Sequence, residues 1–440
     1  MRDPDGFLEQ HGSRLVRRLL RPAESQSFLP TPSARKLVAE GKLVAFKVVA
    51  PDLLEVEKIP FVTAPFEWCD DQLRHAAELT LDVSEAALVD GHELKDASAW
   101  NVIFSGCRPV FCDHLSFRPI RRQQWWAFGQ FLRHFAFPLA VSAATGLGGA
   151  RIFRLSRDGL QAVEARRLLG LRRFGTRLWP LFLLSPSADA KAPQSDPSAA
   201  SGAGTNGFHS HLYRYCRWSL ADVGTTRPPA GAWLDYTTTR QHYSVQSQDA
   251  KAAAVSVWID ATQPAWLVDL GANTGEFTFM AASKGAKVIA VEQDASCVSE
   301  LYRRANGDAS IFPVLSNLGD LCGGCGWLGN EHSGLHSRLR GAAQMVLALA
   351  VLHHLAISES IPLDRIADFV ADITTRHAIV ELIPEDDPMV LQLSAQRERN
   401  AHEFSLSAQL AAFGRHFEIL ATRDLEGSRR QLVLMQRRPS

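Results

Sequence analysis

The stretch Trp266-Leu-Val-Asp-Leu-Gly-Ala-Asn-Thr-Gly-Glu-Phe277 decides the fold of the C-terminal half of this chain. An apolar run ends at Gly271, Gly275 follows, and a segment of small and apolar residues continues to Ala282. This order predicts a β-strand, a tight glycine turn and a helix. Glycine suits such a turn because a Cβ would keep a bound ligand away from the backbone.

The turn is predicted to bind a nucleoside that carries no phosphates. A helix N-terminus is a ready site for an anion, but Glu276 places a carboxylate there, where it would compete with a pyrophosphate. The next predicted strand ends at Glu292, and an acid about 20 residues after the glycine turn suits hydrogen bonds to a ribose. Nicotinamide dehydrogenases share these two features, but Gly-Ala-Asn-Thr-Gly is not G-x-G-x-x-G, which disfavours that class.

Strand-like and helical runs alternate from this turn to the end of the sequence. The strand-like runs are Trp266–Leu270, Lys287–Val291, Ser310–Leu315, Met345–Leu349, Ala378–Leu382, Phe417–Thr422 and Gln431–Met435. The last two suit a terminal antiparallel pair. The alternation predicts a Rossmann-like α/β fold, doubly wound around a mostly parallel seven-stranded sheet, with its ligand at the carboxyl ends of the strands.

Composition divides the 440 residues into two domains. Residues 185–207 are almost entirely Ser, Ala, Pro, Gly, Asp and Lys, which cannot bury enough apolar surface to order a segment. We therefore predict a flexible linker there, an α+β N-terminal domain over residues 1–184, and the ligand-binding domain over residues 208–440. Residues 208–262 are predicted to form a helical lead-in to that second domain.

The N-terminal domain gives weaker local signals. Residues Gln10 to Leu20 predict a basic helix, and Asp71 to Leu88 predict an amphipathic helix from the spacing of their apolar residues. The runs 101–104 and 109–112 predict a hairpin around Ser105-Gly106.

The overall charge gives no reason to expect nucleic acid or an anionic membrane as a partner, because 47 basic residues balance 47 acidic ones. Local arginine runs, Arg166-Arg167 and Arg172-Arg173 among them, are expected to be solvated faces. No signal peptide is visible, and no apolar run reaches the roughly 20 residues of a membrane span. Seven thinly spread cysteines do not suggest a disulfide framework. We expect a cytoplasmic protein.

The glycine turn resembles the first motif of class I S-adenosylmethionine-dependent methyltransferases. The whole chain also resembles a bacterial family of such methyltransferases that is related to nodulation-type enzymes. The segments that carry this resemblance are Leu94–Asn101, Pro109–Phe117, Val268–Gly275 and Leu349–Ala356. It implies S-adenosylmethionine as cofactor and methyl transfer, with an oxygen of a small-molecule or glycan-like acceptor as the expected target.

The resemblance also implies roles for the residues of the turn. Gly271, Asn273 and Gly275 would shape the cofactor turn, Asp269 would order it, and Glu292 would bind the ribose.

Further roles fall on residues after the third and fourth predicted strands. Asn317 would meet the adenine amino group, with Asp320 as the second candidate and an ordinary polar loop as the alternative. A histidine of near-neutral pKa could take a proton from an attacking hydroxyl. His353 is the first choice for this base and His354 the second, unless one of them only caps a helix and packs under the cofactor.

Two positions depart from the pattern of that family. The family usually has an acid where Asn317 stands and a Pro/Ser-rich turn where Cys322-Gly-Gly-Cys325 stands. A structural zinc normally takes four ligands. His332 and His336 lie near enough in the sequence to add to the two cysteines, but glycine-rich turns explain the C-x-x-C spacing equally well. No metal is therefore predicted.

The N-terminal half carries a kinase-like pattern. Asp96 and Asn101 have the D-x-x-x-x-N spacing of a kinase catalytic loop, Asp113 follows, and Lys47 echoes the kinase strand lysine. In kinases these groups serve as base, metal ligands and phosphate contact. No glycine-rich loop is visible. An active kinase, a kinase-like scaffold without that activity and a substrate-recognition domain of another fold all stay open. So the alternatives to a methyltransferase are an inactive methyltransferase-fold binding protein and a bifunctional kinase–methyltransferase.

Overall fold

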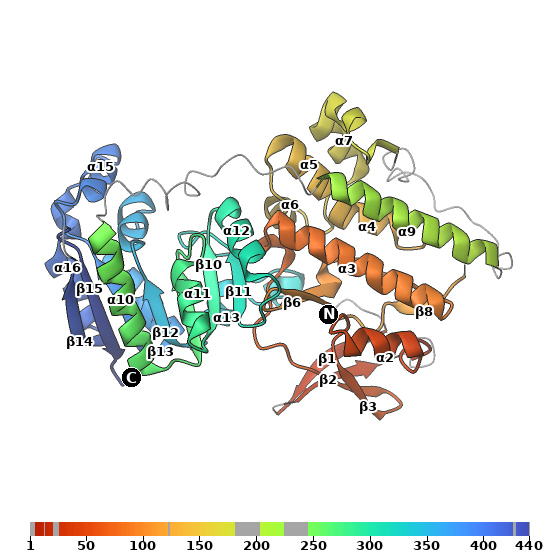
Figure 1. Cartoon of the computed structure of the whole chain (residues 1–440), viewed down its shortest axis with the longest axis horizontal. Coiled ribbons are helices and arrows are strands. Elements are labelled where there is room, and N and C mark those ends of the chain that lie inside the picture. Colours follow the sequence, from red (N-terminus) through yellow and green to blue (C-terminus); the bar gives the residue numbers. More distant parts are fainter. Residues whose placement is uncertain are drawn as a thin grey trace. The chain divides into compact units, whose positions relative to one another are not determined.

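The computed structural model describes residues 5–12, 14–20, 26–121, 124–180, 203–223, 245–425 and 428–439. The chain divides into two compact units, residues 1–229 and 230–440 (Figure 1). Most of the predicted linker, residues 185–202, lies outside the described residues.

The second unit is built on a seven-stranded sheet in the order β11-β10-β9-β12-β13-β15-β14. Every pair is parallel except β13 with β15 and β14 with β15, which are antiparallel. The strands are β9 (Trp266–Leu270), β10 (Lys287–Glu292), β11 (Ile311–Leu315), β12 (Ala343–Ala348), β13 (Thr374–Leu382), β14 (Phe417–Asp424) and β15 (Gln431–Arg437). This order confirms the predicted doubly wound fold, including its antiparallel terminal pair.

Helices separate these strands and cover the sheet (Figure 1). They are α10 (Val245–Thr262), α11 (Glu276–Ser283), α12 (Ala295–Ala305), α13 (Leu335–Leu339), α14 (Leu363–Ile373), α15 (Pro388–Gln396) and α16 (Leu406–Gly414), with the short turns η7 (Trp327–Gly329), η8 (His354–Ser358) and η9 (Ala401–Phe404). The sheet forms the core because its central strands are runs of fully buried aliphatic residues. The chain order reverses between β9 and β12, so a crevice opens at the carboxyl ends of these two strands.

The first unit contains a four-stranded antiparallel sheet in the order β1-β2-β4-β3. Its strands are β1 (Gly6–His11), β2 (Arg14–Leu19), β3 (Phe46–Ala50) and β4 (Leu53–Val56), and the short pairs are β5 (His92–Leu94) with β8 (Phe117–Pro119) and β6 (Val102–Ser105) with β7 (Arg108–Phe111). The predicted helix from Gln10 to Leu20 is therefore wrong, because these residues form the hairpin of β1 and β2. The predicted hairpin around Ser105-Gly106 is confirmed.

The first unit contains the long helix α3 (Asp70–Val89), which confirms the helix predicted from Asp71 to Leu88, and several other helices of this unit pack against it. The others are α2 (Pro32–Ala39), α4 (Phe128–Phe131), α5 (Phe137–Thr145), α6 (Gly149–Leu155), α7 (Ala162–Leu169) and α9 (Ala203–Val223), with the turns η1 (Pro65–Glu67), η2 (Ala99–Asn101), η3 (Leu132–Ala136) and η4 (Gly170–Gly175). Arg217 of α9 pairs with Asp82 and Glu85 of α3 at 2.8 and 3.2 Å. Residues 208–223 thus belong to the first unit, whereas we had placed them in the lead-in to the second.

Among the described residues, no single helix is long and apolar enough to cross a membrane. The segments Phe128–Thr145 and Gly149–Leu155 pass the length and composition test only as a pair bent by 119°. Their aromatic residues Phe131, Phe135 and Phe137 are fully buried in the core of the first unit.

Candidate functional site

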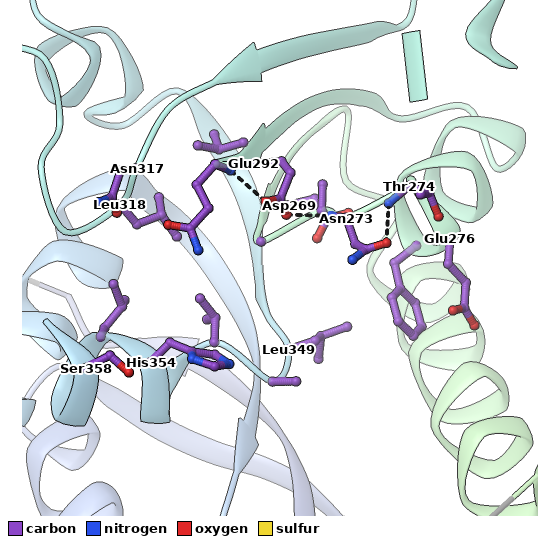
Figure 2. Close-up of a pocket in the computed structure, with 18 of the residues that line it drawn as sticks. Asp269, Asn273, Thr274, Glu276, Glu292, Asn317, Leu318, Leu349, His354 and Ser358 are labelled. Carbon is purple, nitrogen blue, oxygen red and sulfur yellow. Dashed lines mark hydrogen bonds between the residues drawn. The ribbon is translucent and has the colours of Figure 1, made fainter. Parts of the chain in front are cut away.

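A cavity of about 460 Å³ lies at the carboxyl ends of β9, β10, β11 and β12 (Figure 2). This volume falls within the range of about 300–1,000 Å³ that small-molecule sites occupy. The wall includes six of the eight predicted site residues: Asp269, Gly271, Asn273, Glu292, Asn317 and His354. Gly275 and His353 lie outside the wall.

The glycine turn connects β9 to α11 in the left-handed region of backbone space. Gly271, Asn273 and Gly275 have φ of +73°, +50° and +90°. A Cβ on Gly275 would come within 2.9 Å of Phe279 and 3.0 Å of Leu301. Gly275 is therefore required by the packing of the helix and by its φ, rather than by the approach of a ligand as we had argued from the sequence. Only its positive φ requires glycine at Gly271, since a Cβ there would make ordinary contacts.

Asp269 ties the end of β9 to α11. Its Oδ2 accepts a hydrogen bond of 2.7 Å from the Thr278 hydroxyl, and its side chain is buried on the wall of the cavity. Burial raises the pKa of Asp269 to about 6, although the bond from Thr278 opposes this shift. This bond reaches α11 and not the turn itself, so the role of ordering the turn stays a prediction.

Glu292 ends β10, and its carboxylate lies beside the glycine turn on the wall of the cavity (Figure 2). Its Oε2 accepts a bond of 2.9 Å from the backbone N–H of Asn273, and its Oε1 accepts from the N–H groups of Gln293 and Asp294 at 2.7 and 2.8 Å. Burial raises the pKa of Glu292, while the three N–H donors oppose that shift. A carboxylate has about four acceptor positions, so Oε2 keeps capacity for one further donor.

Asn317 stands on the wall after β11, next to a second polar group. Its Oδ1 accepts from the Gly319 N–H at 2.8 Å, which fixes the loop. The neighbouring Ser316 also lines the cavity, and its buried hydroxyl makes no hydrogen bond within the described structure. Sequence reasoning missed Ser316, because a single serine after a strand carries no signal of its own.

The two histidines after β12 occupy different environments. His354 lines the cavity (Figure 2), whereas His353 is 1% exposed and packs behind it, with ring centroids 4.1 Å apart. Burial lowers the pKa of His354 to about 4, with Arg430 adding to the shift, and burial lowers that of His353 well below its ordinary value. The expectation of a near-neutral pKa is therefore corrected, and the cavity favours His354 over our first choice.

A buried ionic network lies behind the cavity. Lys251 of α10 lines the wall and pairs with Glu381 of β13 at 2.5 Å. Arg430 then joins Glu381 at 3.2 Å to Asp387 at 2.7 Å. Each carboxylate has a cation, as a buried charge requires. Arg430 could not have been found from sequence, since it precedes β15 and is remote in the chain from both acids.

The cysteine pair lies in a loop after β11. The Cys325 N–H donates to the His332 carbonyl at 3.0 Å, which closes a glycine-rich turn, and His336 pairs with Asp372 at 2.9 Å. The parts of the chain that the structure describes hold no group of three or more His, Cys, Asp or Glu side chains placed to bind a metal.

The kinase-like residues of the first unit do come together. The Ser116 hydroxyl donates to Asp113 at 2.5 Å and accepts from Asn101 Nδ2 at 3.1 Å. However, Arg17 binds the Asp113 carboxylate at 2.7 Å. Burial would raise the pKa of Asp113, but Arg17 and the hydrogen bonds lower it overall. A carboxylate that already holds an arginine is poorly suited to a metal ion, and Lys47 is exposed on β3.

No family model matches this chain. It is 28% identical over 460 residues to the nodulation protein NoeA of Rhizobium meliloti (strain 1021), and the alignment covers 99% of this chain and 95% of that protein. The chain is thus related to a nodulation protein over its whole length, which agrees with the predicted relationship of both halves to one family.

Solved structures of low identity are also similar. Magnesium protoporphyrin IX methyltransferase of Synechocystis, solved with bound S-adenosylhomocysteine, is 15% identical, with a TM-score of 0.31 over 44% of this chain and 84% of that one. The N-methyltransferase NodS of Bradyrhizobium japonicum is 8% identical (TM-score 0.33, 44% and 99%). The kinase–methyltransferase WbdD is 17% identical (TM-score 0.29, 43% and 39%). The fold assignment itself rests on the strand order of the sheet.

Proposed function

We propose that the second unit transfers the methyl group of S-adenosylmethionine to an oxygen of a small-molecule or glycan-like acceptor. The observation that carries this proposal is the placement of Glu292. Its carboxylate stands at the end of β10 and binds the glycine turn directly, through the Asn273 N–H at 2.9 Å, with Oε2 able to accept one more hydrogen bond. A ribose hydroxyl is the donor that an acid in this position of a doubly wound sheet commonly takes.

The rest of the cavity supports the same cofactor. Asn317 and the unpartnered hydroxyl of Ser316 are neighbouring polar groups on the wall after β11, and they suit hydrogen bonds with an adenine. On the other side of the turn, the exposed carboxylate of Glu276 lines the cavity. A carboxylate there suits the cationic amino and sulfonium groups of S-adenosylmethionine and opposes a pyrophosphate.

The part of the wall formed by η8 and α15 suits a neutral polar acceptor. His354, Ser358 and Gln392 bring hydrogen-bonding groups to the wall, and Met389 and Leu393 of α15 add apolar surface. In the proposed reaction the acceptor oxygen attacks the methyl carbon, the carbon–sulfur bond breaks, and its electron pair stays on sulfur. Burial lowers the pKa of His354 to about 4, so the ring is neutral and a weak base. His354 accepts the hydrogen bond of the attacking hydroxyl and orients it, and the proton passes to water as the oxygen–carbon bond forms.

Calorimetry with S-adenosylmethionine and S-adenosylhomocysteine on the full chain tests the cofactor assignment. Glu292→Ala should weaken binding at least tenfold, because a hydrogen bond to a charged group contributes about 1.5–3 kcal/mol. Glu418→Ala, an exposed acid on β14, is the matched control and should bind as the unmodified chain does. Absence of binding by the unmodified chain would refute the proposal, and unchanged affinity in Glu292→Ala would remove the ribose assignment.

Turnover separates an enzyme from an inactive binding protein of the same fold. Transfer of a labelled methyl group to an oligosaccharide or small polyol by the full chain, lost in His354→Ala while cofactor affinity is kept, is the expected result. Tight cofactor binding without transfer to any acceptor offered would favour the binding protein.

A further inference from the structure

The first unit presents a surface on which arginines and apolar side chains are interleaved. We call it the Arg–Leu surface and define it by Val163, Arg167, Leu168, Leu171, Arg172 and Phe174. The inward face of α7 is buried through Ala162, Ala165 and Leu169. Val163, Arg167 and Leu168 therefore lie on its outward face. The following turn, η4, contains no buried residue. Leu171 and Phe174 are 83% and 58% exposed.

The charge of this surface is strongly one-sided. Residues 159–180 contain five arginines and a single acid, Glu164. Glu164 is used locally, because its Oε2 accepts a bond of 2.8 Å from the Gln161 N–H at the start of α7. Arg167, Arg172 and Arg173 form no ion pair with any carboxylate of the described chain, in contrast with Arg217 on the neighbouring α9, which holds two acids.

Aromatic rings hold two of the arginines in place. The Arg173 guanidinium lies 4.5 Å from the centroid of the Phe174 ring, and that of Arg177 lies 4.5 Å from the centroid of Trp218 on α9. Trp218 and Trp179 are themselves half exposed. A guanidinium stacked on an exposed aromatic ring is held at the surface with one face toward solvent.

The chemistry of the surface distinguishes among partners. A nucleic acid would satisfy the arginines, but it would leave Leu168 and Leu171 against phosphate and water. Exposed leucine, phenylalanine and tryptophan side chains surrounded by arginine are the combination that enters the headgroup region of a bilayer with negative lipids. We propose that the Arg–Leu surface docks the protein onto an anionic lipid bilayer. This differs from our expectation of a solvated face, which considered only the charges.

The proposed contact of the Arg–Leu surface with a bilayer is peripheral, and it does not depend on methyl transfer by the second unit. Leu171 and Phe174 would enter the acyl boundary, and Arg167 and Arg172 would lie at the phosphate level. The neutral charge of the whole chain does not oppose this, because electrostatic attraction at a surface depends on charges within about 10 Å at ordinary salt.

Co-sedimentation of the full chain with large vesicles tests the proposal. We expect binding to phosphatidylcholine vesicles that contain phosphatidylglycerol, little binding to phosphatidylcholine alone, and weaker binding as salt is raised. Arg167→Glu/Arg172→Glu should lower the partition coefficient about 30-fold or more, since each cation near such a surface contributes about 1 kcal/mol. Leu171→Ser/Phe174→Ser should lower it at least tenfold, with the salt dependence kept.

Matched controls lie on the same unit. Val48→Ser/Val49→Ser removes two exposed apolar residues of β3, and Arg35→Glu/Lys58→Glu reverses two exposed cations elsewhere. Both should bind vesicles as the unmodified chain does, and circular dichroism should be the same for all variants. Equal binding to both kinds of vesicle, equal loss in the control variants, or no vesicle binding would overturn the proposal. The proposal would also be overturned if binding of duplex RNA, or self-association, depended on these residues and vesicle binding did not.

Discussion

His354 and Asp269 face the same cavity, and burial shifts their pKa values in opposite directions. The pKa of His354 falls from 6.5 to about 4, so between these values the unfolded chain binds a proton that the folded chain does not. Stability is therefore lost as the pH falls through this window. The pKa of Asp269 rises from 3.8 to about 6, so the folded chain binds the extra proton there and regains stability as the pH falls. His353 acts in the same sense as His354.

His354→Asn should therefore make the second unit less sensitive to acid. The loss of unfolding free energy between pH 7 and pH 5 should shrink by up to about 2 kcal/mol, which is the limit set by about 1.4 kcal/mol per unit of pKa shift. Urea unfolding followed at both pH values measures the difference. His402→Asn, which changes a histidine whose side chain is 82% exposed, should leave the acid sensitivity unchanged. An equal effect of both substitutions would contradict the assignment to burial.

The sequence predicted which residues line the cavity better than it predicted their protonation states. The positions of Asp269, Glu292, Asn317 and His354 follow from strand ends, because parallel strands bring their carboxyl ends to one edge. The pKa of His354, the exclusion of His353 from the wall and the pairing of Arg430 with Glu381 depend on packing between remote segments. No local pattern encodes such contacts, so these features could not be predicted.

At the scale of single elements, the β9–turn–α11 unit allows a direct comparison of two glycines. Gly275 and Gly285 have nearly the same φ, +90° and +91°, but only Gly275 has neighbours that an added Cβ would strike. Gly275→Ala should cost about 1–3 kcal/mol more of unfolding free energy than Gly285→Ala, because overpacking adds to the conformational strain. Urea unfolding of the two variants gives this difference directly. Equal losses would mean that φ alone requires glycine in the turn.

Elements with strong periodicity were predicted, whereas the hairpin of β1 and β2 was not. Helix α3 and the strands of the large sheet follow from regular apolar spacing. Residues 10–20 were assigned to a helix on their basic residues, although Gly12 stands between two runs. Gly12 has φ of +62° and joins β1 to β2. Arg17 of β2 is buried and bound to Asp113. An arginine can be buried on a strand when a residue distant in the sequence pairs with it, and local sequence patterns do not show such a partner.

At the scale of the whole molecule, the chain forms two units with separate cores, and its boundary was predicted only approximately. Composition identified the polar segment 185–207, but α9 begins within that segment and packs on α3. Helix α9 begins inside the polar segment and belongs to the unit before it. Composition alone cannot reveal such a return of the chain, because it reports where apolar residues are scarce and not which core the next helix joins.

Separate cores predict separate responses to a ligand. A ligand that binds only the folded second unit stabilises that unit by RT ln(1 + [L]/Kd), about 2.7 kcal/mol at a hundredfold excess over Kd. Calorimetric unfolding of the full chain should show two transitions, and S-adenosylhomocysteine should raise the midpoint of one and leave the other in place. Phe131→Ala, in the core of the first unit, should lower only the midpoint that the ligand does not move, by removing a buried ring worth about 3–5 kcal/mol. One cooperative transition, shifted by both changes, would instead show that the two units unfold together and that the cofactor site and the first unit stabilise each other.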